Sequence, residues 1–180
     1  QKMGAHTVAV VGEIQDFITG HAARNEVLVK NDGSPLTIAD VKKRLRLLLA
    51  ERNLQESGTI FAAGRDAGVP HNVGNPAVPL RLGETIIFDA FFQEAGGGYF
   101  YDFTRTWCLG FARDEVLSVY EQLQEVYAKV VDAVCAGNSF HHYHKMTCSL
   151  FEAMGHANLQ SNPLTENGFV HGLGHCAGLE

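Results

Sequence analysis

The chain has 180 residues, a length that predicts one domain with a substantial core, and 46% of its residues are hydrophobic, as in ordinary soluble proteins. A formal net charge of −6 without a basic stripe argues against nucleic-acid and acidic-membrane partners. The sequence has no apolar run near the roughly 20 residues of a membrane span, and no secretory signal. Its four cysteines form no Cys-x-x-Cys pair, which favours free thiols in a reducing cytoplasm.

Two helices are predicted first. Apolar residues recur near helical spacing from about residue 6 to about residue 30, which indicates the first helix. The second begins at Thr37, because Thr37 and Asp40 have the spacing of a capping box. We interpret the basic cluster Lys42–Arg46 as the solvated face of this helix. Its opposite stripe is apolar and contains Val41, Leu45, Leu48 and Leu49.

Strands and turns follow from Ser57. A short strand leads into Gly- and Pro-rich loops that contain His71. The segment TIIFDAFFQEAGGGYFYDFTRTW then predicts a β-hairpin folded about Ala95–Gly96. We interpret the run Gly96–Gly98 as its turn rather than a phosphate loop, because it lacks the Lys-Ser/Thr ending and opens a strand.

Two further helices and a strand complete the predicted order. The third helix covers about residues 113–136 and the fourth runs from Ser139, its N-cap, to about Met154. Turn residues follow, then a strand that contains the HGLGH segment. The order of helix, helix, strands, helix, helix and strand predicts an α+β fold.

Asp89 and Asp102 are the first candidate site residues. Side chains alternate in a strand, so the predicted hairpin places both carboxylates near each other on one face, where two like charges call for a cation or a shared proton. Thr104 and Thr106 share the face of Asp102 and are suited to orient a carboxylate. The alternative is structural: Asp89 is a turn or edge residue, and Asp102 pairs with Arg105.

Three histidines are further candidates. In a strand, His171 and His175 would point to the same side, and the glycines beside them leave room for a ligand; two polar residues at a loop edge are the alternative. His71 is either a surface residue or part of a loop that caps the same pocket. We exclude a metal site at His141, His142, His144 and Cys148, since these residues start a helix and fall on different faces.

Two carboxylates and one imidazole suit divalent manganese, iron, cobalt or zinc, and carboxylates that share cations suggest a two-metal hydrolytic centre. The ordered set Pro70-His71, Asp89, Asp102-Phe103-Thr104-Arg105-Thr106 and HGLGH resembles the M24 metallopeptidases of the pita-bread fold, most of all the Xaa-Pro aminopeptidase and prolidase branch. The resemblance implies one catalytic domain over residues 1–180 with an antiparallel sheet and flanking helices. It implies cleavage of the first peptide bond by a metal-activated water.

The same resemblance implies residue roles. Asp89 would be a terminal ligand of one metal, Asp102 would bridge both metals, and His175 would bind the other. His71 and His171 would contact substrate and stabilise the developing oxyanion. Manganese is the first choice of metal, with cobalt, zinc or iron as alternatives. The implied partner is a peptide, with proline as a candidate second residue and a homodimer as a candidate assembly.

The family pattern also contains two glutamates and another histidine after HGLGH, and none of them lies in these 180 residues. We therefore expect a piece of a longer protein, with three of five ligands, that is not itself an active peptidase. A non-catalytic pita-bread module that binds peptides or proteins is the alternative. Metal-free hydrolysis of a small molecule, as in creatinase, is less consistent with the two aspartates.

Overall fold

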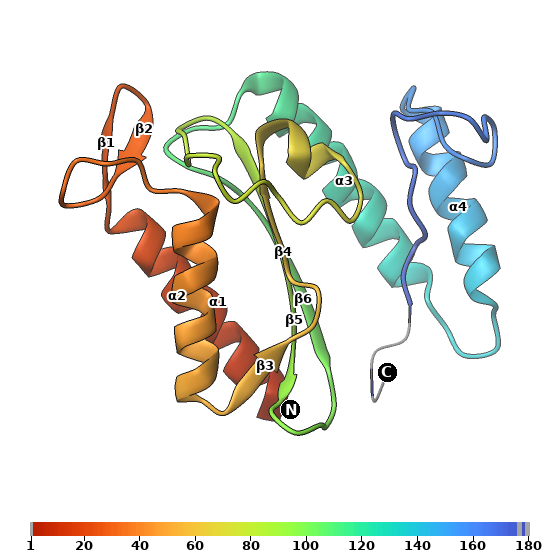
Figure 1. Cartoon of the computed structure of the whole chain (residues 1–180). Helices are drawn as coiled ribbons and strands as arrows, with labels where there is room; N and C mark the ends of the chain where they lie inside the picture. Colours follow the sequence, from red (N-terminus) through yellow and green to blue (C-terminus); the bar gives the residue numbers. More distant parts are fainter. Residues whose placement is uncertain (1, 176–177, 179–180) are drawn as a thin grey trace. The chain divides into compact units, whose positions relative to one another are not determined.

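The computed structural model describes residues 2–175 and residue 178, and it confirms the predicted α+β fold (Figure 1). The chain divides into two compact units, residues 2–112 with Gly178 and residues 113–175, and each is described by itself. The first unit contains α1 (Lys2–Thr19), β1 (Ala22–Arg24), β2 (Val27–Val29), α2 (Ile38–Glu51), β3 (Leu54–Glu56), β4 (Ile60–Ala63), a 3-10 helix (Gly64–Gly68), β5 (Thr85–Glu94) and β6 (Tyr101–Cys108). The second contains α3 (Asp114–Ala133) and α4 (Phe140–Ala153).

The sheet of the first unit is built around β5. This strand pairs antiparallel with β6 along one edge, and with β3 and β4 one after the other along its second edge. Near the start of β6, the Phe100 amide donates to the carbonyl of Gly178 at 2.7 Å. The antiparallel pairing of β5 with β6 confirms the predicted hairpin, and β5 is the central strand of the sheet.

The helices α1 and α2 cover one face of this sheet (Figure 1). Alternate residues of β5 point into the same core as the apolar stripe predicted for α2, and both sets are buried. The largest fully buried side chains of the unit include Ile14, Ile18, Leu45, Leu48, Phe61, Phe88 and Phe92. Because one face of the sheet is filled in this way, the other face remains for polar residues.

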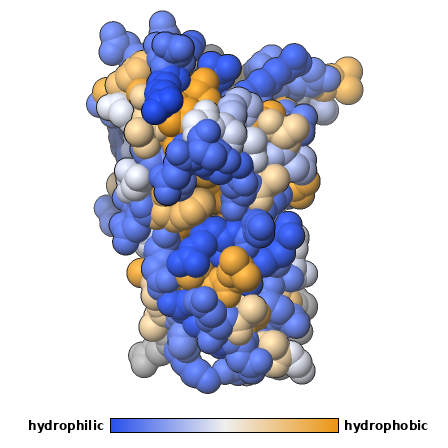
Figure 2. Space-filling model, turned by 60° about the vertical axis from the view of Figure 1, so that its left-hand side comes forward, coloured by the Kyte–Doolittle hydropathy of each residue, from blue (hydrophilic) through white to orange (hydrophobic). Residues whose placement is uncertain are grey.

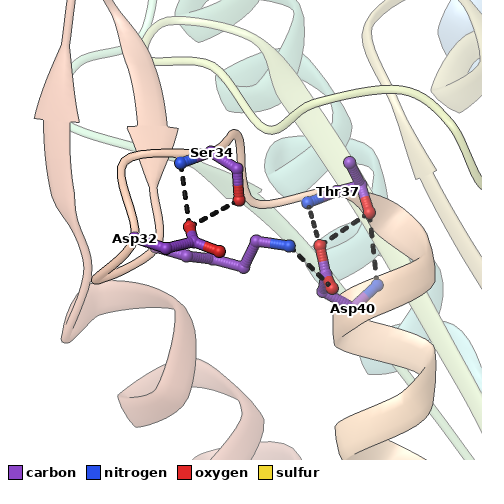
Figure 3. Close-up of polar contacts among 5 residues, drawn as sticks. Asp32, Ser34, Thr37 and Asp40 are labelled. Carbon is purple, nitrogen blue, oxygen red and sulfur yellow. Dashed lines mark hydrogen bonds and ion pairs between the residues drawn. The ribbon is translucent and has the colours of Figure 1, made fainter.

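The start of α2 is fixed by the predicted capping box (Figure 3). The Asp40 carboxylate accepts from the Thr37 amide at 2.9 Å and from the Thr37 hydroxyl at 2.8 Å, and the Thr37 oxygen accepts from the Asp40 amide at 3.3 Å. Lys30 Nζ lies 3.3 Å from the same carboxylate. Burial raises the pKa of Asp40, but these hydrogen bonds and the Lys30 charge outweigh it and lower the pKa overall. In the preceding turn, the amide and the hydroxyl of Ser34 both donate to Asp32 Oδ1, at 2.9 and 2.6 Å (Figure 3).

The first helix is shorter than predicted. It ends at Thr19, and the hairpin of β1 and β2 occupies the second part of the expected helix. The connecting residues Asn25 and Glu26 both adopt positive φ, 49° and 64°, as a type I′ turn requires. Two strands of three residues each carry too little periodicity to be separated from a helix by sequence pattern.

The second unit contains both predicted helices, which pack through Val126, Val130 and Tyr143. Ser139 accepts from the His142 amide and caps α4 as predicted. Much of the apolar periodicity of α3 does not reach a core, since Leu123 and Tyr127 are exposed.

The strand predicted for HGLGH is wrong within the described residues. Up to His175, the segment after α4 forms turns and one isolated bridge between Asn158 and Phe169. A strand requires a partner along its length, and one bridge does not provide it.

Figure 2 is turned so that the side of Figure 1 on which α1 and α2 are drawn comes forward. Polar residues predominate on the face shown, with smaller hydrophobic areas between them. Among the helices of residues 2–175, none combines the length and the hydrophobicity that crossing a bilayer requires.

Candidate metal centre

Asp89 and Asp102 lie on the face of the hairpin that points away from the helices. In β5, the buried positions Ile86, Phe88 and Ala90 alternate with partly buried ones, and Asp89 is one of the latter. The β5–β6 register pairs Asp89 with Thr104, and it pairs Phe91 with Asp102. Paired residues share a face, so both carboxylates lie on the side of the sheet opposite the core.

The register also corrects one detail of the predicted geometry. A hairpin folded about Ala95–Gly96 would set Asp89 directly opposite Asp102, whereas the observed pairing offsets them by two positions. They are therefore diagonal neighbours, whose Cα atoms are typically about 7–8 Å apart in such a pair. The glycine-rich turn causes the offset, because Gly96, Gly97 and Gly98 all adopt positive φ and extend the connection.

A threonine orients one of the carboxylates, as predicted. Thr104 Oγ1 donates to Asp89 Oδ1 at 2.6 Å across the strand pair. This hydrogen bond fixes the rotamer of Asp89 and leaves its second oxygen available for another interaction. The geometry is that of a carboxylate prepared to bind a ligand from the open face.

The alternative interpretation of Asp102 is that its carboxylate pairs with Arg105 of the same strand. The two residues are three positions apart on β6 and so point to opposite faces. The guanidinium of Arg105 donates to the carbonyl of Thr104 at 2.8 Å and lies 3.7 Å from the centroid of the Phe103 ring. Arg105 is therefore held on the other side of the strand.

An aromatic pair lies beside the carboxylates. Phe91 is the pairing partner of Asp102, and its ring stacks on Phe100 with centroids 4.5 Å apart and planes inclined by 5°. The same face of the sheet thus combines two carboxylates with an apolar surface, a combination typical of sites that bind both a charged group and an apolar side chain.

His71 belongs to the first unit and lies in the loop between the 3-10 helix and β5. It is exposed and adopts φ 60°, a left-handed conformation that is uncommon for a residue with a Cβ. The loop is seated against β4, the neighbour of β5, because at Gly74 an added Cβ would lie 2.2 Å from the carbonyl oxygen of Phe61. Strain of this kind at a candidate residue is consistent with a functional role.

His171 and His175 lie in the second unit, in an exposed segment without regular structure. His171 Nδ1 lies 2.9 Å from the carbonyl of Gly172. Among residues 2–175 and 178, no three His, Cys, Asp or Glu side chains are grouped closely enough to hold a metal ion. On α4, the expectation that the histidines and Cys148 fall on different faces is wrong for one pair, because His144 Nε2 lies 3.6 Å from Cys148 Sγ on the same helix face.

The predicted solvated face of α2 is confirmed for Lys43 and Arg46, which are exposed, whereas Lys42 is partly buried and makes a tertiary contact. Its Nζ donates to the carbonyl of Val73 at 2.6 Å, in the loop that carries His71. Burial lowers the pKa of Lys42, Glu56 opposes this shift, and Arg46 adds to it. No pattern in the sequence distinguishes Lys42 from the exposed Lys43 beside it, because its partner is a backbone atom 31 residues away.

Comparison with known families decides the classification. Residues 8–180 match the model of the family described as metallopeptidase family M24. The chain belongs to metallopeptidase family M24. Members of this family generally bind divalent metals and act on peptides. The carboxylate pair fits that chemistry, because hard divalent cations prefer oxygen ligands.

Solved structures show the same pita-bread fold as this M24 chain. An Xaa-Pro dipeptidase from Bacillus anthracis has 19% identity and a TM-score of 0.76, covering 99% of this chain and 44% of that one. A prolidase from Pyrococcus furiosus has 18% identity and a TM-score of 0.73, covering 99% and 47%. An X-Pro aminopeptidase from Thermotoga maritima has 18% identity and a TM-score of 0.73, covering 97% and 44%. The chain thus spans less than half the length of these proteins, and a comparison with curated proteins finds no match.

Proposed function

We propose that this chain carries ligands of a dinuclear metal centre in an aminopeptidase or dipeptidase of the Xaa-Pro type. The observation that carries the proposal is the β5–β6 register, which sets Asp89 and Asp102 on one non-core face with Thr104 bonded to Asp89. Support for the peptide class comes from membership of family M24, and support for the Xaa-Pro type comes from the names of the structural relatives.

Each candidate site residue has a proposed role in metal binding or in substrate binding. Asp89 and Asp102 would hold the metals, with Asp102 bridging, and His175 would add a nitrogen ligand. The bound metals, manganese in the first instance, would supply an activated water for hydrolysis of the first peptide bond. His71 and His171 would contact the substrate and stabilise negative charge on the carbonyl oxygen.

Because the chain spans about 44% of its first structural relative, turnover is proposed for a protein of the relatives' length. For the 180-residue chain itself we expect weak metal binding without peptide turnover. Tight binding of two metals per chain, or hydrolysis of an Xaa-Pro dipeptide by this chain alone, would contradict that expectation.

Titration with Mn²⁺ tests the ligand assignment directly. Thr104→Val is expected to weaken binding by about tenfold, the lower end of the 10–100-fold range that loss of an orienting partner typically costs, and Asp89→Asn and Asp102→Asn are each expected to weaken it more. Asp32→Asn, in an exposed turn of the same unit, is the matched control and should leave the affinity unchanged. Equal affinity in all four variants would refute the ligand assignment and favour a metal-free binding module.

A further inference from the structure

The loop that carries His71 is attached to the beginning of α2 by three hydrogen bonds. The amides of Ile38 and Ala39 donate to the carbonyls of Val78 and Pro76 at 3.0 and 2.9 Å. One turn later, Lys42 Nζ donates to the carbonyl of Val73 at 2.6 Å. The first amides of a helix have no partner inside the helix, so the loop carbonyls satisfy two of them.

The Lys42 contact is the one nearest to His71. Val73 follows His71 by two residues, and between them Asn72 accepts from the Gly74 amide at 2.9 Å. Gly74 is pressed against β4 with φ 82° and no space for a Cβ. The peptide of Val73 is therefore held from one side by β4 through Gly74 and from the other by α2 through Lys42.

The backbone of His71 needs such support. A non-glycine residue at φ 60° is strained, and strained conformations persist only where the surroundings determine them. The peptide between Val73 and Gly74 is bonded at both ends, because its N–H donates to Asn72 and its carbonyl accepts from Lys42. Asn72 belongs to the same loop, so the charge-assisted hydrogen bond of Lys42 is the one of the two that ties this peptide to α2.

The location of the amine agrees with this role. Lys42 is partly buried, and burial lowers its pKa, whereas its neighbour Lys43 is exposed. A lysine without a tertiary partner on the solvent-facing side of a helix would extend its amine into water, as lysine side chains normally do.

We propose that Lys42 is a positioning residue that holds the strained backbone of His71 through the carbonyl of Val73. The consequence for peptide hydrolysis rests on the proposed function, in which His71 contacts substrate. The ordering of the loop does not depend on that function.

The test compares Lys42→Met, which keeps the apolar stem and removes the donor, with Lys42→Arg, which keeps a cationic donor. Lys43→Met is the matched control one position along α2. In the 180-residue chain, amide exchange of Gly74 should be about five- to tenfold faster in Lys42→Met, the usual effect of one hydrogen bond. It should change less than about twofold in the other two variants. The imidazole resonances of His71 should shift in Lys42→Met and return in Lys42→Arg.

Unchanged Gly74 exchange and unchanged His71 resonances in Lys42→Met would overturn the proposal. In a protein of the relatives' length, Lys42→Met should lower kcat by a larger factor than it raises KM, and Lys42→Arg should restore kcat. If the loop responds as expected but the parent protein hydrolyses no peptide, the proposed function fails and the positioning role stands. If turnover is normal in Lys42→Met although the loop has loosened, the link between His71 and catalysis fails.

Discussion

Replacing Asp40 by asparagine tests the energetic account of the capping box. The carboxylate accepts two hydrogen bonds from Thr37 and lies 3.3 Å from Lys30 Nζ. The asparagine side chain would keep one acceptor oxygen but lose the charge that strengthens these bonds. The side chain of Asp40 is 28% exposed, so the ion pair contributes less than about 1 kcal/mol. Together with the weakened hydrogen bonds, we expect Asp40→Asn to lower the free energy of unfolding by about 1–1.5 kcal/mol at pH 7.

The loss should depend on pH in a defined direction. The pKa of Asp40 is lower in the folded chain than its ordinary value of 3.8, so the folded state favours the ionised form. That stabilisation is complete above the unfolded pKa and is lost as the pH falls through the folded pKa. The difference between the parent chain and Asp40→Asn should therefore be constant near neutrality and shrink as the pH falls below about 4.

Urea unfolding followed by the fluorescence of Trp107 provides the assay. Trp107 is the single tryptophan, and its ring lies 5.7 Å from that of Phe88 in the core of the first unit, so it reports the unit that contains α2. Thr37→Ser keeps the capping oxygen and serves as the control, with an expected loss below about 0.5 kcal/mol. A difference for Asp40→Asn that is absent at pH 7, or equal at pH 7 and pH 3, would refute the reasoning.

Three further outcomes are expected. Gly74→Ala should destabilise the first unit by more than about 2 kcal/mol, because its Cβ would lie 2.2 Å from a carbonyl oxygen of β4. The control Gly58→Ala, at a similar φ but with no atom within 4 Å of the added Cβ, should destabilise it by only about 1 kcal/mol. Equal urea midpoints for the two variants in the Trp107 assay would contradict this prediction. Glu26→Gly should stabilise the same unit by about 0.5–1 kcal/mol, since it relieves a positive φ in the type I′ turn, and a lower urea midpoint would be inconsistent with that turn. With Cys108 and Cys176 replaced by serine, iodoacetamide should modify the exposed Cys135 well before Cys148. Cys148 is 2% exposed, and burial and Glu152 raise its pKa, so it has less reactive thiolate. Comparable modification rates of the two thiols by mass spectrometry would exclude the described packing.

Local patterns predicted the parts of the fold that depend on neighbouring residues. Thr37 and Asp40 stand three residues apart, and their side chains make the expected reciprocal bonds. The alternation in β5 and β6 placed Asp89 and Asp102 on a common face, and it paired a threonine with one of them. These results follow from helix and strand periods, which are properties of the sequence alone.

Features that depend on distant backbone could not be predicted. The two-position offset of the aspartates depends on how three glycines turn, and glycine leaves that choice open. Lys42 meets a carbonyl whose position is set by β4 and Gly74, so nothing adjacent to Lys42 identifies its partner. The strand expected for HGLGH required a pairing partner, which no periodicity within the segment specifies.

The connection between β5 and β6 separates two kinds of change in length. The two carboxylates share a face because Thr104, the pairing partner of Asp89, stands two residues from Asp102 on β6. A residue inserted between Glu94 and Tyr101 would lengthen the connection without changing which strand residues pair. A single insertion in β6 between Asp102 and Thr104 would instead turn Asp102 toward the helices, unless a β-bulge restored the phase. Related sequences are therefore expected to vary in length in the glycine turn, and to keep the length of the strand segments that carry the carboxylates.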